Sequence, residues 1–369
     1  MPDEKTGRLD EDYVVQMKGI TKVYPNGVAA NQGVDFNLRR GEIHALMGEN
    51  GAGKSTLMKM LFGLEQPTSG EIWVHGEKLT LSSPTVAISH GIGMVHQHFM
   101  LVPSLTVAEN MVLGMAPRKG LFIDHAKAVA ITKEYAEKYN LHVEPEAKVM
   151  DIPVGMKQKV EILKALVRGA KILILDEPTS QLDPIAASDF LATLGKINRE
   201  LGTTVLLTEH RLEEAFAFAS RVAVMDGGKL LCTGTPAEVG AELKSSGNAM
   251  FLAMPAAMRI WAATDSKAAC PVSVCDGRNW LLDYAKTHEL QPIPEENKNA
   301  PDTETVVSAR ELWFKYDKDL PDVVKGLSLK LHKGEFLALL GGNGTGKTTT
   351  LKLLANLKKA YRGELAITG

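Results

Sequence analysis

The stretch GENGAGKST, residues 48–56, fits the pattern G-x4-G-K-[ST], which is typical of loops that hold nucleotide phosphates. The preceding EIHALM reads as a buried strand, and the following KSTLMKMLFGL reads as an amphipathic helix. Glycines let backbone N–H groups curl around phosphate oxygens, and the helix N-terminus adds a partial positive charge. The sequence therefore predicts a phosphate-binding loop between a strand and a helix of an α/β fold.

Two side chains of this loop have predicted roles. Lys54 would reach the β- and γ-phosphates of a nucleotide, and the Ser55 hydroxyl would hold Mg²⁺. We expect the contacts to ATP to come from Gly48, Asn50, Gly51, Ala52, Gly53, Lys54, Ser55 and Thr56.

The chain contains this region twice. Residues 19–64 are echoed by residues 309–357, with Tyr24 matched to Tyr316 and Lys54 to Lys347 at offsets of 292 and 293 residues. An offset so nearly constant indicates two copies of one domain. In the second copy we expect the nucleotide contacts to come from Tyr316, Gly341, Asn343, Gly344, Gly346, Lys347, Thr348 and Thr349, with Thr348 as the Mg²⁺ ligand and the same strand and helix around the loop.

The copies differ in length. Only 53 residues follow Tyr316, so we expect a first domain at 12–245, a spacer and linker at 246–306, and an incomplete N-terminal part of a second domain at 307–369. The chain is then either a fragment or a tandem protein with a remnant copy. Within the spacer, Met250, Met254 and Met258 recur every four residues, a pattern that favours a packed helix face over a binding surface.

The stretch KILILDEP, residues 171–178, predicts the other half of the nucleotide site. Its apolar residues suit a buried parallel strand that ends in Asp176 and Glu177, at the edge where α/β proteins bind ligands. Asp176 could reach the Mg²⁺ shell, and Glu177 could polarise an attacking water.

Together these motifs resemble those of ATP-binding cassette (ABC) ATPases, the motors of membrane transporters, across both copies. The resemblance implies a P-loop NTPase fold of the α/β class. It also implies that Tyr24 stacks on adenine and that Gln97, in MVHQHF, links Mg²⁺ to the transport partner. By the same resemblance, SQLD at 180–183 is the D-loop, and His210, in LLTEHRL, is the switch histidine near the γ-phosphate.

The residues PVGMK at 153–157 resemble the ABC signature with one departure. In the family, the signature of one domain closes on ATP held by the loop of another, in a head-to-tail dimer. Here Pro153 takes the place of the usual serine, while Val154, Gly155 and Met156 continue the motif. Loss of a hydroxyl that bonds a charged group is worth roughly 1.5–3 kcal/mol, so closing or turnover would weaken. The alternative is that Pro153 is a tolerated variant.

The resemblance changes along the chain. Residues 17–175 resemble ATPases of simple-sugar and nucleoside importers, whereas residues 178–369 resemble the tandem ATPases of energy-coupling-factor importers for vitamins and metals. The changeover falls at LDEPTS, so a natural hybrid and an artificial join both fit. The cargo class stays open between sugar or nucleoside and vitamin or metal.

Composition limits the function classes further. Lys plus Arg (42) nearly balance Asp plus Glu (44), and we expect no nucleic-acid partner. The leading hypothesis is an importer ATPase at the cytoplasmic face of the membrane, using Glu177, His210 and Gln97 in catalysis and Ser55, Gln97 and Asp176 for Mg²⁺. Its partners would be transmembrane permease subunits and a second ATPase domain, with a substrate-binding protein or a vitamin-binding membrane subunit as further candidates.

Two other hypotheses remain. A binding-only or weakly active cassette would follow from Pro153 and the incomplete second copy. A soluble tandem ABC protein acting on ribosomes or DNA fits less well, because the linker at 287–306 is acidic and contains proline, and only 58 residues separate Gln97 from Gly155.

Overall fold

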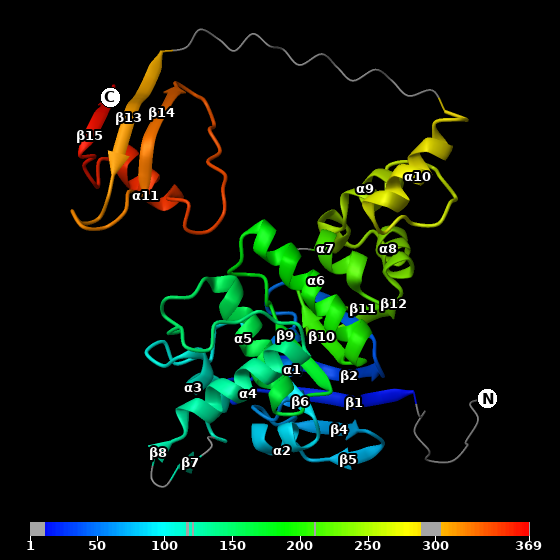
Figure 1. Cartoon of the computed structure of the whole chain (residues 1–369). Helices are drawn as coiled ribbons and strands as arrows, with labels where there is room; N and C mark the ends of the chain where they lie inside the picture. The colour runs from blue at the N-terminus through cyan, green and yellow to red at the C-terminus, as the bar shows by residue number, and fades with distance from the viewer. Residues whose placement is uncertain (1–11, 116–117, 120–121, 210–211, 289–303, 369) are drawn as a thin grey trace. The chain divides into compact units, whose positions relative to one another are not determined.

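The computed structural model describes residues 12–115, 118–119, 122–209, 212–288 and 304–368 (Figure 1). Contacts divide the chain into two units. The first comprises Met1–Leu182 and Ala186–Glu289, and the second comprises Asp183–Ile185 and Leu290–Gly369. Among the described residues, no helix has both the length and the apolar character that crossing a membrane requires.

The centre of the first unit is a six-stranded sheet in the order β12-β11-β3-β10-β9-β6. Its strands run parallel, except that the edge strand β12 is antiparallel to β11. Every residue of β9 and β10 is buried, as expected for strands covered on both faces. The bounds are β3 Ile43–Gly48, β6 Ile92–Val95, β9 Ile172–Asp176, β10 Thr204–Thr208, β11 Arg221–Asp226 and β12 Lys229–Gly234.

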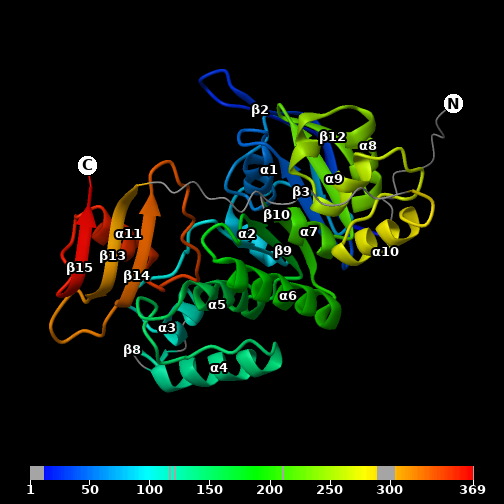
Figure 2. The same ribbon diagram turned by 90° about the horizontal axis from the view of Figure 1, so that it is seen from above.

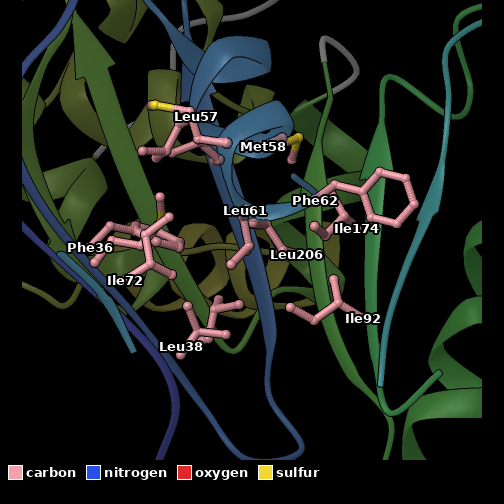
Figure 3. Close-up of a cluster of buried hydrophobic side chains, with 14 of the residues drawn as sticks. Phe36, Leu38, Leu57, Met58, Leu61, Phe62, Ile72, Ile92, Ile174 and Leu206 are labelled. Carbon is pink, nitrogen blue, oxygen red and sulfur yellow. The ribbon is translucent and has the colours of Figure 1, made fainter. Parts of the chain in front are cut away.

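A second sheet of this unit is antiparallel, in the order β2-β1-β4-β5. Helix α1, Lys54–Leu61, buries Leu57 and Leu61 in a cluster with Phe36 of β2 and Ile174 of β9 (Figure 3). The helix that follows the glycine loop is therefore fixed by both sheets. The strand bounds are β1 Tyr13–Val23, β2 Ala29–Arg39, β4 Ser69–Val74 and β5 Glu77–Leu79.

Helices α3, α4 and α5 gather on one side of the first unit (Figure 2). Helix α3 starts at a capping box in which Thr106 and Glu109 bond each other's backbone N–H groups. The remaining bounds are α2 Pro84–Ser89, α3 Val107–Val112, β7 Arg118–Lys119, β8 Phe122–Ile123, α4 His125–Lys138, α5 Val154–Val167, α6 Pro184–Leu201 and α7 Leu212–Phe218.

The spacer packs onto the first unit. It follows α8 Pro236–Ser245 and contains the 3-10 helix η1 Ala249–Ala253, α9 Ala256–Ala262 and α10 Val274–Tyr284. Met254 and Met258 are buried with β11, α8 and two tryptophans of α9 and α10, so the packed face is confirmed. The single helix is not, because Pro255 ends one segment and begins the next. The domain boundaries remain a proposal, and this packing favours a first domain that extends through α10.

The second unit contains a three-stranded sheet, β14-β13-β15, and one helix, among residues 304–368. Its strands are antiparallel, as in the second sheet of the first unit. The bounds are β13 Thr305–Phe314, β14 Val324–His332, α11 Lys347–Leu354 and β15 Arg362–Ile367. Most of the linker lies outside the described residues.

One expectation for the second copy is wrong. EFLALL, the counterpart of β3, forms no strand, and the side chains of Phe336 and Leu340 are 96% and 89% exposed. In the first unit, β3 pairs with β10 and β11, which come from residues far later in that copy. Residues 341–368 supply no such partners. A parallel strand without neighbours has no ladder to join, so the apolar sequence alone does not make it extended.

The buried pair His44 and Glu42 predicts a pH dependence of stability. His44 is fully buried in β3, and its Nδ1 lies 3.1 Å from Glu42 Oε1. Burial lowers the pKa of His44 below its ordinary value of 6.5, against the opposing pull of Glu42. In the pH range below 6.5 the unfolded chain therefore binds the proton more readily than the folded one, and stability falls as the pH falls.

We expect the melting temperature to drop when the pH is lowered from neutral through 6.5 and to drop less steeply in His44→Gln. Some slope should remain, because burial also lowers the pKa values of His75 and His96. Melting curves of the two proteins across that pH range provide the check. Equal slopes would contradict the role given to His44.

Candidate nucleotide-binding site

The glycine loop has a backbone that side chains other than hydrogen would disturb. Gly53, the N-cap of α1, has φ 95°, in the left-handed region. A Cβ at Gly53 would collide with the Ala30 carbonyl of β2, and one at Gly48 would collide with the Met225 carbonyl of β11. Among the described residues, no side chain caps α1. The described side chains therefore leave its first N–H groups uncapped, and phosphate binding at this end of α1 stays a prediction.

Lys54 lies inside the curve of the loop. Its Nζ donates to the carbonyl oxygens of Gly48 and Glu49 at 2.7 and 3.0 Å, and its side chain is buried. Burial lowers the pKa of Lys54, while Glu177 and Asp176 favour its charged form. The ammonium is therefore held at the centre of the loop by weak carbonyl acceptors that a phosphate would outcompete.

Ser55 and Asp176 meet as the sequence predicted. Ser55 Oγ donates to Asp176 Oδ1 at 3.0 Å, and Thr208 Oγ1 donates to the same oxygen at 3.0 Å. Octahedral Mg²⁺ binds oxygens at roughly 2.0–2.1 Å, which places two adjacent ligands about 2.9 Å apart. The separation of Ser55 Oγ and Asp176 Oδ1 fits such a pair, so these residues suit Mg²⁺.

Glu177 stands beside this pair in a strained conformation. Its φ of 48° is unusual for a residue other than glycine, and such strain gathers at functional sites. The Glu177 N–H donates to Thr208 Oγ1 at 2.9 Å, which fixes the turn. Gln97 Nε2 donates to Glu177 Oε2 at 2.9 Å, so the structure brings together two of the three side chains that the sequence predicted to be catalytic.

The D-loop and the Gln97 segment also touch. Gln181 Nε2 donates to the Gln97 carbonyl at 3.1 Å and lies 3.2 Å from His98 Nδ1. Close by, Thr179 donates through its N–H and its hydroxyl to Glu209, at 3.0 and 2.7 Å. This tie fixes the residue directly before His210. His210 itself lies outside the described residues.

Pro153 is the N-cap of α5. It has φ −59° and ψ 154°, and its carbonyl accepts from the N–H groups of Met156 and Lys157 at 3.0 and 3.1 Å. The helix begins at Val154, so the proline leaves the fold of this segment intact, as expected. No side chain caps this end of α5 in the described part of the chain. A serine there would supply a hydroxyl to the first turn.

The second unit repeats the loop geometry. Gly341 has the same φ as Gly48, 156°, and Gly346 is a left-handed N-cap at φ 89°. Lys347 Nζ donates to the carbonyls of Gly341 and Gly342 at 2.7 and 2.6 Å. The loop and α11 thus keep their form without the missing strand.

The two candidate adenine-stacking residues have different surroundings. The Tyr316 hydroxyl lies 3.0 Å from Thr349 Oγ1, so this tyrosine is tied to α11. Tyr24 is half-buried in the turn after β1, with Lys22 Nζ 5.2 Å from its ring centroid. Adenine stacking stays a proposal for both.

Several residues of the site were not predicted from the sequence. They are Thr208, which bonds Asp176, Thr179 and Glu209, which bond each other, and Gln158 of α5, which donates to the Pro178 carbonyl at 2.6 Å. Thr208 and Glu209 directly precede His210 at the end of a buried strand, and that position was the available signal.

A sequence model of the family described as ABC transporter matches residues 31–180 and 324–369. The two stretches cover more than half of the chain, and the chain belongs to this family. It has the α/β P-loop NTPase fold, and the second stretch matches the second copy.

Relatives of known transport class align over nearly the whole chain. Nucleoside import ATP-binding protein NupA of Lactococcus lactis is 37% identical over 97% of this chain. Guanosine import ATP-binding protein NupO of Bacillus subtilis is 37% identical over 97% of it. The chain covers 63% and 62% of the lengths of these two relatives. Both alignments continue across LDEPTS, so the likeness to nucleoside-importer ATPases does not end at the changeover.

Among solved structures, cbiO1 from Clostridium perfringens superposes with a TM-score of 0.55 and 28% identity, covering 64% of this chain and 95% of that one. It is described as part of the ABC transporter complex cbiONQ.

Proposed function

We propose that the first unit binds Mg·ATP at the glycine loop and hydrolyses it as the motor of an ABC-type importer. The observation that carries the proposal is the meeting of three segments: Ser55, which follows Lys54 in the chain, bonds Asp176, and Gln97 bonds Glu177. These segments are distant in sequence, and each supplies a different part of phosphoryl-transfer chemistry.

Each residue has a distinct task in this proposal. Lys54 and the N–H groups of α1 hold the phosphates. Ser55, Asp176 and Gln97 would hold Mg²⁺, which would neutralise charge on the phosphate oxygens when bound. Glu177 accepts a proton from the attacking water, and Gln97 fixes the direction of its carboxylate.

For the biological role, we propose nucleoside or sugar import. The support is that the similar proteins named above include nucleoside and guanosine import subunits, and that Glucose import ATP-binding protein TsgD13 of Haloferax volcanii is 33% identical over 98% of this chain. The partners would be transmembrane permease subunits, contacted at the cytoplasmic face, and a second ATPase domain, with a substrate-binding protein as a further candidate.

The test is steady-state ATP turnover by the purified full chain. We expect turnover with Mg²⁺ and none with EDTA, because Ser55 and Asp176 are arranged for the metal. Binding of ATP without turnover would favour the binding-only cassette that Pro153 suggests, and no binding would contradict the proposal. Co-purification with permease subunits in detergent tests the importer role separately.

A further inference from the structure

Helix α5 holds the segment that follows Gln97 through two side chains that have no role in the proposed function. The Met100 N–H donates to Glu161 Oε1 at 2.6 Å, and the Met100 carbonyl accepts from Lys164 Nζ at 3.0 Å. Both polar groups of one peptide residue are thus held by two charged side chains of one helix. We call Glu161 and Lys164, with the Met100 backbone between them, the α5 clamp.

The clamp is built into the interior. The side chains of Glu161 and Lys164 are buried, whereas the Met100 side chain points into solvent with 58% exposed. Burial raises the pKa of Glu161 and lowers that of Lys164, so both groups carry the cost of desolvation. Apolar side chains would pack at these two positions with a smaller desolvation cost. We therefore expect the two charged groups to serve in positioning the loop backbone.

The clamp connects two parts of the nucleotide site. Met100 is three residues from Gln97, which bonds Glu177, and α5 begins at the signature residues after Pro153. Met100 therefore links α5 to the loop that carries Gln97. Gln158, on the same helix, bonds the Pro178 carbonyl next to Glu177 and gives α5 a second attachment.

Two residues after Met100, the loop is held by α3 instead of α5. Asn110 of α3 accepts from the Val102 N–H at 2.7 Å and donates to the Val102 carbonyl at 3.1 Å. The end of the loop is therefore fixed by α3, the Met100 backbone is held by α5, and the Gln97 carbonyl is held by Gln181 of the D-loop.

We propose that Glu161 and Lys164 are positioning residues. Through them, the orientation of Gln97 toward Glu177 depends on the position of α5, the helix that begins at the signature residues. Binding of another domain at the signature residues would then change the orientation of Gln97 and of the Glu177 carboxylate through α5 and Met100. The turnover part of this inference rests on the proposed function, whereas the structural part does not.

The chain offers well-matched variants. Glu161→Ala and Lys164→Met each open one side of the clamp, the second while keeping the side-chain stem. Glu161→Gln retains an oxygen that can accept from the Met100 N–H. Lys159→Met makes the same change on the same helix, but Lys159 bonds Asp189 and does not contact the loop.

The first measurement is amide hydrogen exchange of residues 97–102 in the full chain, by mass spectrometry and without nucleotide. Loss of a bond to a charged group should speed exchange of this segment roughly 10- to 100-fold in Glu161→Ala and Lys164→Met. Glu161→Gln and Lys159→Met should exchange like the unchanged protein. Unchanged exchange in both clamp variants, or equal acceleration throughout the first unit, would overturn the clamp.

The second measurement is the split between kcat and KM for ATP. Positioning through Gln97 predicts a fall in kcat of roughly tenfold or more in the two clamp variants. KM should stay unchanged, and Glu161→Gln should recover most of kcat. A faster-exchanging loop with kcat unchanged would refute the coupling. If the unchanged protein shows no turnover, the proposed function fails, and the exchange result still decides the clamp.

Discussion

Glu177→Gln is expected to lower ATP turnover by roughly 10²- to 10⁴-fold, the range that a general base contributes. The substitution keeps the size of the side chain and an oxygen that can accept the Gln97 bond of 2.9 Å. It removes only the ability to take a proton. Binding of Mg·ATP should therefore persist, because Lys54, Ser55 and Asp176 are untouched.

Steady-state kinetics and equilibrium binding of ATP to the same preparation check this prediction. Glu200→Gln is a matched control, since Glu200 is an exposed residue of α6 that pairs with Lys196. It should keep its turnover within about twofold. Turnover by Glu177→Gln close to that of the unchanged chain would remove Glu177 from the mechanism.

Pro153→Ser is expected to raise turnover by roughly 10- to 100-fold, because it places a hydroxyl at the position where the resemblance to the ABC signature implies a bond to a charged phosphate. The structure makes the substitution feasible. Pro153 is exposed at the N-cap of α5, where serine is favoured and the bonds from Met156 and Lys157 to its carbonyl can remain.

Pro153→Ala separates the two groups that proline lacks, since it restores the N–H without the hydroxyl. We expect it to recover less activity than Pro153→Ser. Turnover measured for the three proteins at saturating ATP tests the order. If both variants match the unchanged chain, Pro153 is a tolerated variant and the signature does not limit the rate.

Most of the nucleotide site was predicted from local sequence motifs. The glycine loop, the strand that ends in Asp176 and Glu177, and the start of α5 each depend on residues close together in sequence, so their patterns are readable. Gln97 could be placed by its resemblance to a known motif, and its bond to Glu177 joins residues 80 positions apart.

The features that were missed depend on tertiary contacts. Met100 and Glu161 are 61 positions apart, and Thr179 and Glu209 are 30 apart. No sequence motif at these residues indicates which partner each one contacts. The prediction of a strand at the counterpart of β3 in the second copy was wrong for a related reason. A parallel strand forms only where neighbouring strands supply its hydrogen bonds. The counterpart's apolar sequence, FLALL, resembles that of β3 closely, and yet it stays without a ladder.

The central claim is that the first unit holds the glycine loop together with the acidic pair Asp176 and Glu177 and with Gln97, whereas residues 304–368 of the second hold a loop without a strand-end acidic pair. Turnover of Mg·ATP by Lys54→Ala and Lys347→Ala, measured side by side in the full chain, tests it most directly. Lys54→Ala should lose roughly 10²- to 10³-fold, as when a preorganised donor to the reacting group is removed. Lys347→Ala should stay within about twofold of the unchanged chain. The reverse order, or equal losses in both, would contradict the account.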